Sequence, residues 1–83
     1  MIDRSVMVKM LEILDQLDGL SIEENTLYNE VSLKAARPVT TDVLREHVTE
    51  AKRKGWIEKE AGALGETRWR STNTAAAALH DLR

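Results

Sequence analysis

Few side chains in this 83-residue chain could carry out covalent or metal chemistry. Cysteine is absent, and His47 and His80 are the only histidines, with no second ligand at a metal-binding spacing. Glu23 and Glu24 are adjacent, so on a helix they diverge instead of forming an acid and base pair. No serine stands in a nucleophile-elbow sequence, and "GALGE" lacks the lysine of a phosphate-binding loop. We therefore expect neither an enzyme nor a bound cofactor or metal.

The polar chemistry that remains is carried by arginines, lysines and threonines. Arg45, Thr49 and Arg53 recur every four residues, which places them on one face of a helix. Arg68 and Arg70 flank a tryptophan in "TRWRS", so both point to the same side of a strand. Guanidinium groups bind phosphates and carboxylates equally well. Solvated helix arginines and cross-strand pairs with glutamate are the alternatives to a ligand-binding role.

The charge is unevenly distributed. Residues 1–30 contain two basic and seven acidic residues, whereas residues 31–83 contain ten basic and seven acidic ones. This asymmetry indicates one more basic face, although the net charge of −2 argues mildly against a polyanionic partner. The length fits one domain, residues 1–83, with a modest core. No apolar run could span a bilayer and the N-terminus does not resemble a signal peptide, so we expect a cytoplasmic protein with no membrane partner.

The first helix is predicted between Asp3, its N-cap, and Gly19, its stop. Val6, Met10 and Leu14 recur at helical spacing and predict its buried face. Asp15 and Asp18 in the last turn oppose the helix dipole, which suggests a partner cation from the same chain or from another one, and we favour the same chain. A brief strand around Ile22 follows.

Two further helices are predicted on either side of Pro38. The second begins at Glu23 or Glu24 and should bury Leu27, Val31 and Leu33, with Tyr28 beside them. The third, about residues 40–54, is capped by Thr40 or Thr41 and buries Leu44, Val48 and Ala51. His47 borders that stripe and should be a packed or rim histidine, not a ligand. Gly55 should end the helix, and the preceding Lys52, Arg53 and Lys54 suit its C-terminal dipole.

A hairpin and a final helix complete the chain. The two segments 56–59 and 67–71 have strand composition and are separated by the glycine-containing "EAGALGE". A two-stranded hairpin needs a helix to pack on, so Ile57 and Trp69 should point into the core. The closing "STNTAAAALHDL" predicts a helix that buries Ala76 or Ala77 and Leu79 or Leu82.

This order of elements resembles a winged helix-turn-helix domain, a mostly α fold with a β-hairpin wing. The likeness rests on "VTEAKRKGWIEKE", a helix that ends at Gly55 and opens directly into the hairpin, with Trp69 on the return strand. "TLYNEVSL" is similar to the preceding helix of that family. The resemblance covers nearly the whole chain, from Asp3 to Leu82, and is more specific for the fold than for function.

The resemblance implies duplex DNA binding by a small transcriptional or phage-type regulator. The third helix would lie in the major groove, where arginine can bind guanine and threonine can contact a thymine methyl group. The hairpin, about residues 56–71, would lie on phosphates. The implied DNA-binding residues are Thr40, Thr41, Arg45, Thr49, Lys52, Arg53, Lys59, Arg68 and Arg70.

The sequence also departs from the family pattern. The connection "SLKAARPVTT" is longer than the usual tight turn, and the wing tip "AGALG" has no basic residue. Acidic residues also lie close to the reading face, so the affinity of a monomer should be weak. A homodimer through the first and last helices would double the contacts. The alternative is a winged-helix protein-interaction module, and ion pairs that consumed the arginines would argue for it.

Overall fold

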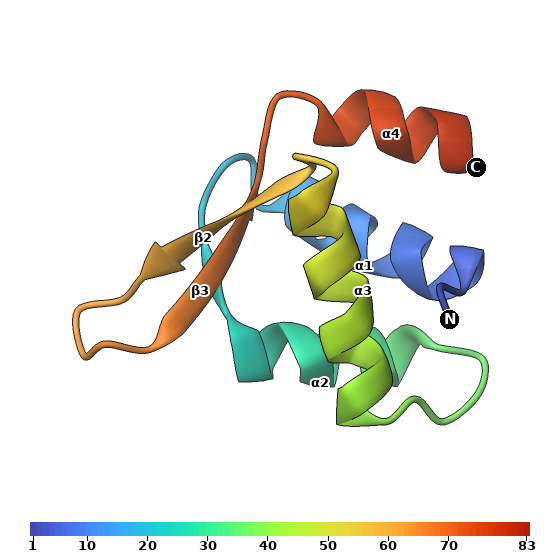
Figure 1. The fold of residues 1–83 in the computed structure, drawn as a ribbon, viewed down its shortest axis with the longest axis horizontal. Helices are drawn as coiled ribbons and strands as arrows, with labels where there is room; N and C mark the ends of the chain where they lie inside the picture. The colour runs from blue at the N-terminus through green and yellow to red at the C-terminus, as the bar shows by residue number, and fades with distance from the viewer.

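The computed structural model describes all residues, 1–83, and confirms the expected order of elements (Figure 1). Four helices and three strands follow one another along the chain: α1 (Arg4–Gln16), β1 (Ile22–Glu23), α2 (Glu24–Lys34), α3 (Thr41–Arg53), β2 (Ile57–Ala61), β3 (Thr67–Ser71) and α4 (Ala75–Leu82). The hairpin of β2 and β3 projects to one side of the helices, and both termini lie on the opposite side (Figure 1).

Helix α1 begins as the sequence predicts and ends slightly earlier. The Asp3 carboxylate accepts hydrogen bonds from the backbone N–H groups of Ser5, at 2.8 Å, and Val6, at 3.4 Å. The last helical residue is Gln16, and the left-handed conformation appears first at Asp18, with φ of 51°, and then at Gly19. The stop therefore lies before Gly19, because aspartate also tolerates this conformation.

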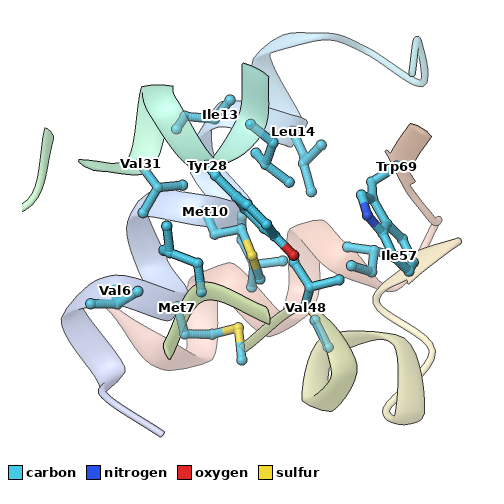
Figure 2. Close-up of a cluster of buried hydrophobic side chains, with 14 of the residues drawn as sticks. Val6, Met7, Met10, Ile13, Leu14, Tyr28, Val31, Val48, Ile57 and Trp69 are labelled. Atoms are coloured by element: carbon cyan, nitrogen blue, oxygen red, sulfur yellow. The ribbon is translucent and has the colours of Figure 1, made fainter. Parts of the chain in front are cut away.

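The core consists of sixteen buried hydrophobic residues contributed by all four helices and by β2 and β3. Figure 2 shows side chains from α1, α2, α3 and both hairpin strands meeting in one cluster, with Ile57 and Trp69 inside it as expected. Leu27, Tyr28 and Val31 of α2 are buried, but Leu33 is 81% exposed. The prediction for Leu33 is wrong because it lies two positions beyond Val31, where the helix has turned toward solvent.

Helix α3 has both of its predicted ends. The Thr40 hydroxyl accepts a hydrogen bond from the Val43 N–H at 3.3 Å. At the other end Gly55 has a φ of 78°, and its N–H donates to the Lys52 carbonyl, while the Trp56 N–H donates to Ala51. These two bonds form a Schellman motif, which requires a left-handed residue at Gly55. The chain thus leaves α3 directly into β2.

The sheet has the strand order β1-β3-β2 and is antiparallel throughout. Lys59 pairs with Trp69, Glu58 with Arg70, and Glu60 with Arg68. Directly opposed residues share a face of the sheet. Lys59 therefore lies on the same face as Ile57 and Trp69, and Arg68 and Arg70 lie on the other.

Helix α4 packs on α1 and ties the two termini together. The Arg4 side chain donates to the Leu82 carbonyl at 2.5 Å, and Arg83 forms an ion pair with Glu12 at 3.0 Å. The buried residues of α4 are Ala75, Ala78 and Leu79. Leu79 was expected, whereas Ala76 and Ala77 are exposed, because the helix is rotated relative to the sequence-based expectation. None of the four helices combines the length and the apolar composition that crossing a bilayer would require.

Candidate nucleic-acid interface

The outer face of α3 presents a row of exposed polar side chains. Thr41, Arg45, Thr49 and Arg53 follow one another at intervals of four residues, and each is exposed. The Thr49 hydroxyl donates to the Arg45 carbonyl at 2.9 Å, so its oxygen can still accept a hydrogen bond. At the helix start the Thr40 oxygen serves as the N-cap acceptor, which leaves its O–H free to donate.

Acidic residues of α3 pair with the arginines of this face. Arg45 lies 3.3 Å from Asp42, and Arg53 binds Glu50 through two hydrogen bonds of 2.8 and 2.7 Å. The bonded Arg53 guanidinium lowers the pKa of Glu50, and Glu50 in turn raises the pKa of Arg53. The arginine side chains nevertheless keep 61% and 67% of their surface exposed. These are solvent-exposed pairs, which water screens and an incoming anion can replace.

A shallow hollow connects the C-terminal end of α3 to the hairpin. It has a volume of about 470 Å³, and its lining includes both Lys52 and Lys59. Gly55, Ile57, Glu58 and Thr72 complete its lining. Neither lysine forms an ion pair, so both ammonium groups are available to a ligand. We call this feature the lysine hollow.

One comparison with known proteins finds a similar fold. A transcriptional regulator of the MarR family from Silicibacter pomeroyi, known from a crystal structure, superposes with a TM-score of 0.74 at 20% sequence identity. The match covers 94% of this chain and 48% of that one, so this chain spans about half the length of that regulator. No protein-family model and no curated protein matches the sequence.

The helix order, the hairpin that follows Gly55 and this superposition agree. The chain is a winged helix-turn-helix domain. In this winged helix, α2 and α3 form the helix-turn-helix, and β2 and β3 form the wing. The connection of residues 35–40 between the two helices is long, as the sequence indicates, and contains no additional helical turn.

The two wing arginines lie on the other face of the hairpin from Lys59, although Glu58, the partner of Arg70, also contributes to the lining of the lysine hollow. Arg70 donates to Glu58 at 2.6 Å, the cross-strand pair that the sequence offers as an alternative role. Arg68 donates to the Ser21 hydroxyl at 2.8 Å and to the Ser21 carbonyl at 2.9 Å, and it lies 3.4 Å from Glu66. Arg68 thus links β3 to the segment that precedes β1. The sequence-based prediction placed these arginines with Lys59 in one phosphate-binding set. They lie on opposite faces of the hairpin, because Lys59 is directly opposite Trp69 and the arginines flank Trp69.

The wing tip is shaped by Glu66. Its carboxylate accepts hydrogen bonds from its own backbone N–H and from that of Leu64, and these bonds lower its pKa. The carboxylate occupies the space where a Cβ at Gly62 would lie, so only glycine fits there without displacing it. Leu64 is left 94% exposed at the end of the wing. The winged helix therefore carries an ordered apolar tip and no basic one.

The proposed dimer surface shows no large apolar patch. The exposed large hydrophobic residues, which are Met1, Ile2, Leu20, Leu33 and Leu64, all lie outside α1 and α4. The same-chain cation expected beside Asp15 and Asp18 is absent, since neither residue forms an ion pair. The homodimer stays a prediction.

His47 is fully buried and bonded to both Val43 and Asp3, which confirms that it is a packed histidine. One buried polar group was not identified from the sequence. Tyr28 was placed beside the core, but its hydroxyl lies inside the protein without a hydrogen-bond partner. Only the i, i+4 spacing of Glu24 and Tyr28 could have signalled a polar cluster, because the third member of the group, Trp69, is distant in the sequence.

Proposed function

We propose that this winged helix binds duplex DNA and acts as a small transcriptional regulator, with α3 in the major groove and the wing along the phosphate backbone. The observation that supports this most directly is the lysine hollow. It brings Lys52 of α3 and Lys59 of the wing to one depression, so an unpaired basic side chain of the helix and one of the hairpin share a surface, with Glu58 beside them. A duplex needs contacts from both elements to fix its orientation.

Each exposed residue has a role suited to its chemistry. Arg45 and Thr49 lie where the helix can reach base edges, and a guanidinium can bind guanine through two hydrogen bonds. Lys52, Arg53 and Lys59 are placed for phosphate contacts, which supply affinity that decreases with salt. Thr40 and Thr41 at the helix start can donate to a phosphate beside the positive end of the helix dipole. The proposal contains no catalytic step.

The acidic partners of the arginines set an upper limit on affinity. Binding to DNA requires Arg45 and Arg53 to exchange Asp42 and Glu50 for phosphate or base oxygens. Because the pairs are exposed, the exchange costs little, but the carboxylates stay nearby and repel phosphate. A monomer should therefore bind weakly, and a homodimer through α1 and α4 is part of the proposal because it doubles the contacts.

The test is fluorescence anisotropy with a labelled random-sequence duplex over a series of salt concentrations. Wild type should bind with a steep dependence of log K on log salt, and Arg45→Glu/Arg53→Glu should abolish binding. Lys34→Glu/Arg37→Glu is the matched control, since it makes the same charge change at two exposed residues, at the end of α2 and in the connection to α3, outside the proposed DNA contacts and the proposed dimer surface. Equal losses in the two double variants, or binding that does not depend on salt, would contradict the proposal.

The second candidate function is protein interaction through the wing. It is favoured by the ion pairs that all four arginines of α3 and the wing form with acidic residues. It is also favoured by Leu64, which is 94% exposed at an ordered tip that has no basic residue. Apolar groups at the centre of a contact are typical of protein interfaces, whereas duplex DNA attracts basic wing tips. Leu64→Lys separates the two functions, because it should strengthen DNA binding and weaken a protein complex.

A further inference from the structure

Strand β2 lies at the edge of the sheet and has one open side. The strand order is β1-β3-β2, so β3 pairs on both of its sides and β2 pairs with β3 alone. Ile57 at the start of β2 is buried, but the four residues from Glu58 to Ala61 are all exposed. The hairpin that carries them projects beyond the helices (Figure 1). An open edge of this kind exposes backbone groups on which another strand can pair.

The hydrogen bonds at the two ends of the hairpin show which backbone groups of β2 face β3. At one end the Thr72 N–H donates to the Trp56 carbonyl at 3.0 Å, and at the other the Gly62 N–H donates to the Glu66 carbonyl at 2.8 Å. In an antiparallel ladder, bonded pairs alternate with pairs that exchange no bond. Both end bonds join even-numbered residues, and the register is continuous between them, so the even-numbered residues of β2 bond to β3.

Lys59 and Ala61 therefore turn their N–H and C=O groups toward the open side of β2. No hydrogen bond from a loop reaches either residue. They are two positions apart, which is about 7 Å along a strand, and a second extended chain repeats its own groups at the same interval. The edge thus offers two donors and two acceptors to one added strand.

Two charges on this edge have no partner. Neither Lys59 nor Glu60 forms an ion pair, whereas Glu58 is bound to Arg70. Lys59 lies on the same face of the hairpin as Trp69, and Glu60 lies on the opposite face. Opposite charges on directly opposed residues stabilise a pair of strands. An added strand is therefore favoured when it places an acidic side chain opposite Lys59 and a basic one opposite Glu60.

A second copy of this protein does not meet that requirement. Antiparallel pairing of two β2 strands about Lys59 places the two lysines opposite each other and Glu58 opposite Glu60. The neighbouring registers with the same bonding pattern place Glu58 opposite Glu58, or Glu60 opposite Glu60. Like charges in these positions are destabilising and protect an edge from self-association. The charges of β2 therefore match a different protein.

We propose that the open edge of β2 is a docking site for an extended segment of a partner protein, which adds a strand to the sheet through Lys59 and Ala61. The segment carries a basic side chain opposite Glu60 and an acidic one opposite Lys59. Main-chain hydrogen bonds supply the affinity of such an addition, and the side chains supply its selectivity. The inference goes beyond DNA binding and does not rest on it. Because Lys59 also lines the lysine hollow, a bound strand and a DNA duplex compete for it.

The test uses the peptide Thr-Val-Lys-Glu-Thr-Val as its probe. In antiparallel pairing its glutamate lies opposite Lys59, its lysine lies opposite Glu60, and its N-terminus lies at the wing tip. Because the protein has no cysteine, Ala63→Cys allows a disulfide to attach the peptide there through an N-terminal Cys-Gly-Gly-Gly linker. Such a linker gives an effective concentration on the order of millimolar, at which weak pairing is detected. The matched control is Thr-Val-Glu-Lys-Thr-Val, which has the same composition and opposes like charges.

Amide hydrogen exchange, followed residue by residue by NMR, is the readout. The attached probe should slow exchange at Lys59 and Ala61 by at least about tenfold relative to the linker alone, and the control peptide should not. The amides of Glu58 and Glu60 should change little, because they already bond to β3. N-methylation of the probe's glutamate should abolish the protection, since its N–H faces Lys59. N-methylation of the probe's lysine should preserve it, since that N–H points away from β2.

Each contrary outcome overturns the proposal. Unchanged exchange at Lys59 and Ala61 with the attached probe would show that the edge takes no strand. Equal protection by the two peptides would show that the edge does not select by charge. Loss of protection with either N-methyl group would show a contact that is not an added strand. No DNA is present, so a protein that docks the probe but binds no duplex would contradict the proposed function alone.

Discussion

The backbone N–H of Asp3 donates to Nε2 of His47 over 2.8 Å and so joins the start of α1 to the middle of α3. The other ring nitrogen of His47 donates to the Val43 carbonyl at 2.7 Å, which fixes the neutral tautomer with its proton on Nδ1. Among the buried residues, His47 is the only one that is not hydrophobic, and its exposure is 0%. The first helix and the proposed reading helix are thus held together by one imidazole.

Replacing His47 should be strongly destabilising. His47→Ala leaves the Asp3 N–H without its acceptor and creates a cavity under α3, so we expect a loss of about 2–4 kcal/mol in the free energy of unfolding. Urea unfolding followed by circular dichroism measures it. His80→Ala is the control, because His80 is exposed and should change stability by less than about 0.5 kcal/mol. Equal effects of the two substitutions would contradict this role.

Gly55→Ala should destabilise the junction between α3 and the wing. A Cβ at this position meets no atom within 4 Å, so the cost arises only from the backbone φ of 78°. We expect about 1 kcal/mol, measured by thermal or urea unfolding. Gly55→Asn should recover part of the loss, since asparagine tolerates the left-handed region. A variant as stable as wild type would show that the junction can adopt another conformation.

The contribution of the wing tip to stability should decrease in acid. Because backbone N–H groups lower the pKa of Glu66 in the folded state, the carboxylate stabilises the wing above the unfolded pKa of about 4.3 and loses this effect as the pH falls through the folded pKa. The free energy of unfolding of Glu66→Gln should therefore decrease less steeply than that of wild type below about pH 4.3. Glu60→Gln, which removes a carboxylate without an ion pair, is the control. Identical pH profiles for wild type and Glu66→Gln would contradict the prediction.

Removing the acidic partner of Arg53 should increase DNA affinity. Glu50→Gln frees the guanidinium and removes a carboxylate that repels phosphate, and we expect about a two- to threefold tighter complex at low salt. Asp18→Asn is the control, because it removes one carboxylate that is exposed, forms no ion pair and lies after α1, outside the proposed interface. Anisotropy with the same duplex measures both. An equal gain from Asp18→Asn would show an effect of net charge alone.

The contribution of the lysine hollow can be read from the salt dependence. Lys59→Ala should reduce the slope of log K against log salt by about 0.9, the value for one phosphate contact. Arg70→Ala should leave the slope unchanged, because Arg70 is paired with Glu58 on the opposite face. The reverse result would show that the wing contacts DNA through its arginines.

Local signals in the sequence account for most of the fold. Asp3, Thr40 and Gly55 each act within one turn of their own position, so the helix ends they form could be predicted. The alternation around Trp69 correctly placed Ile57 and Trp69 in the core. The prediction that Leu33 is buried was wrong, because hydrophobic periodicity determines the buried face least well at the end of a helix.

The sequence by itself determined the order of elements, their ends and the candidate reading face, since those follow from backbone preferences and hydrophobic periodicity. The tertiary structure alone decided which charges share a surface. Alternation around Trp69 already put Arg68 and Arg70 on the outer face, but Lys59 shares the face of Trp69 only because the register pairs the two residues. The hydrogen bond from Trp69 to Glu24 likewise joins residues that are distant in the sequence, and no local preference encodes such a contact.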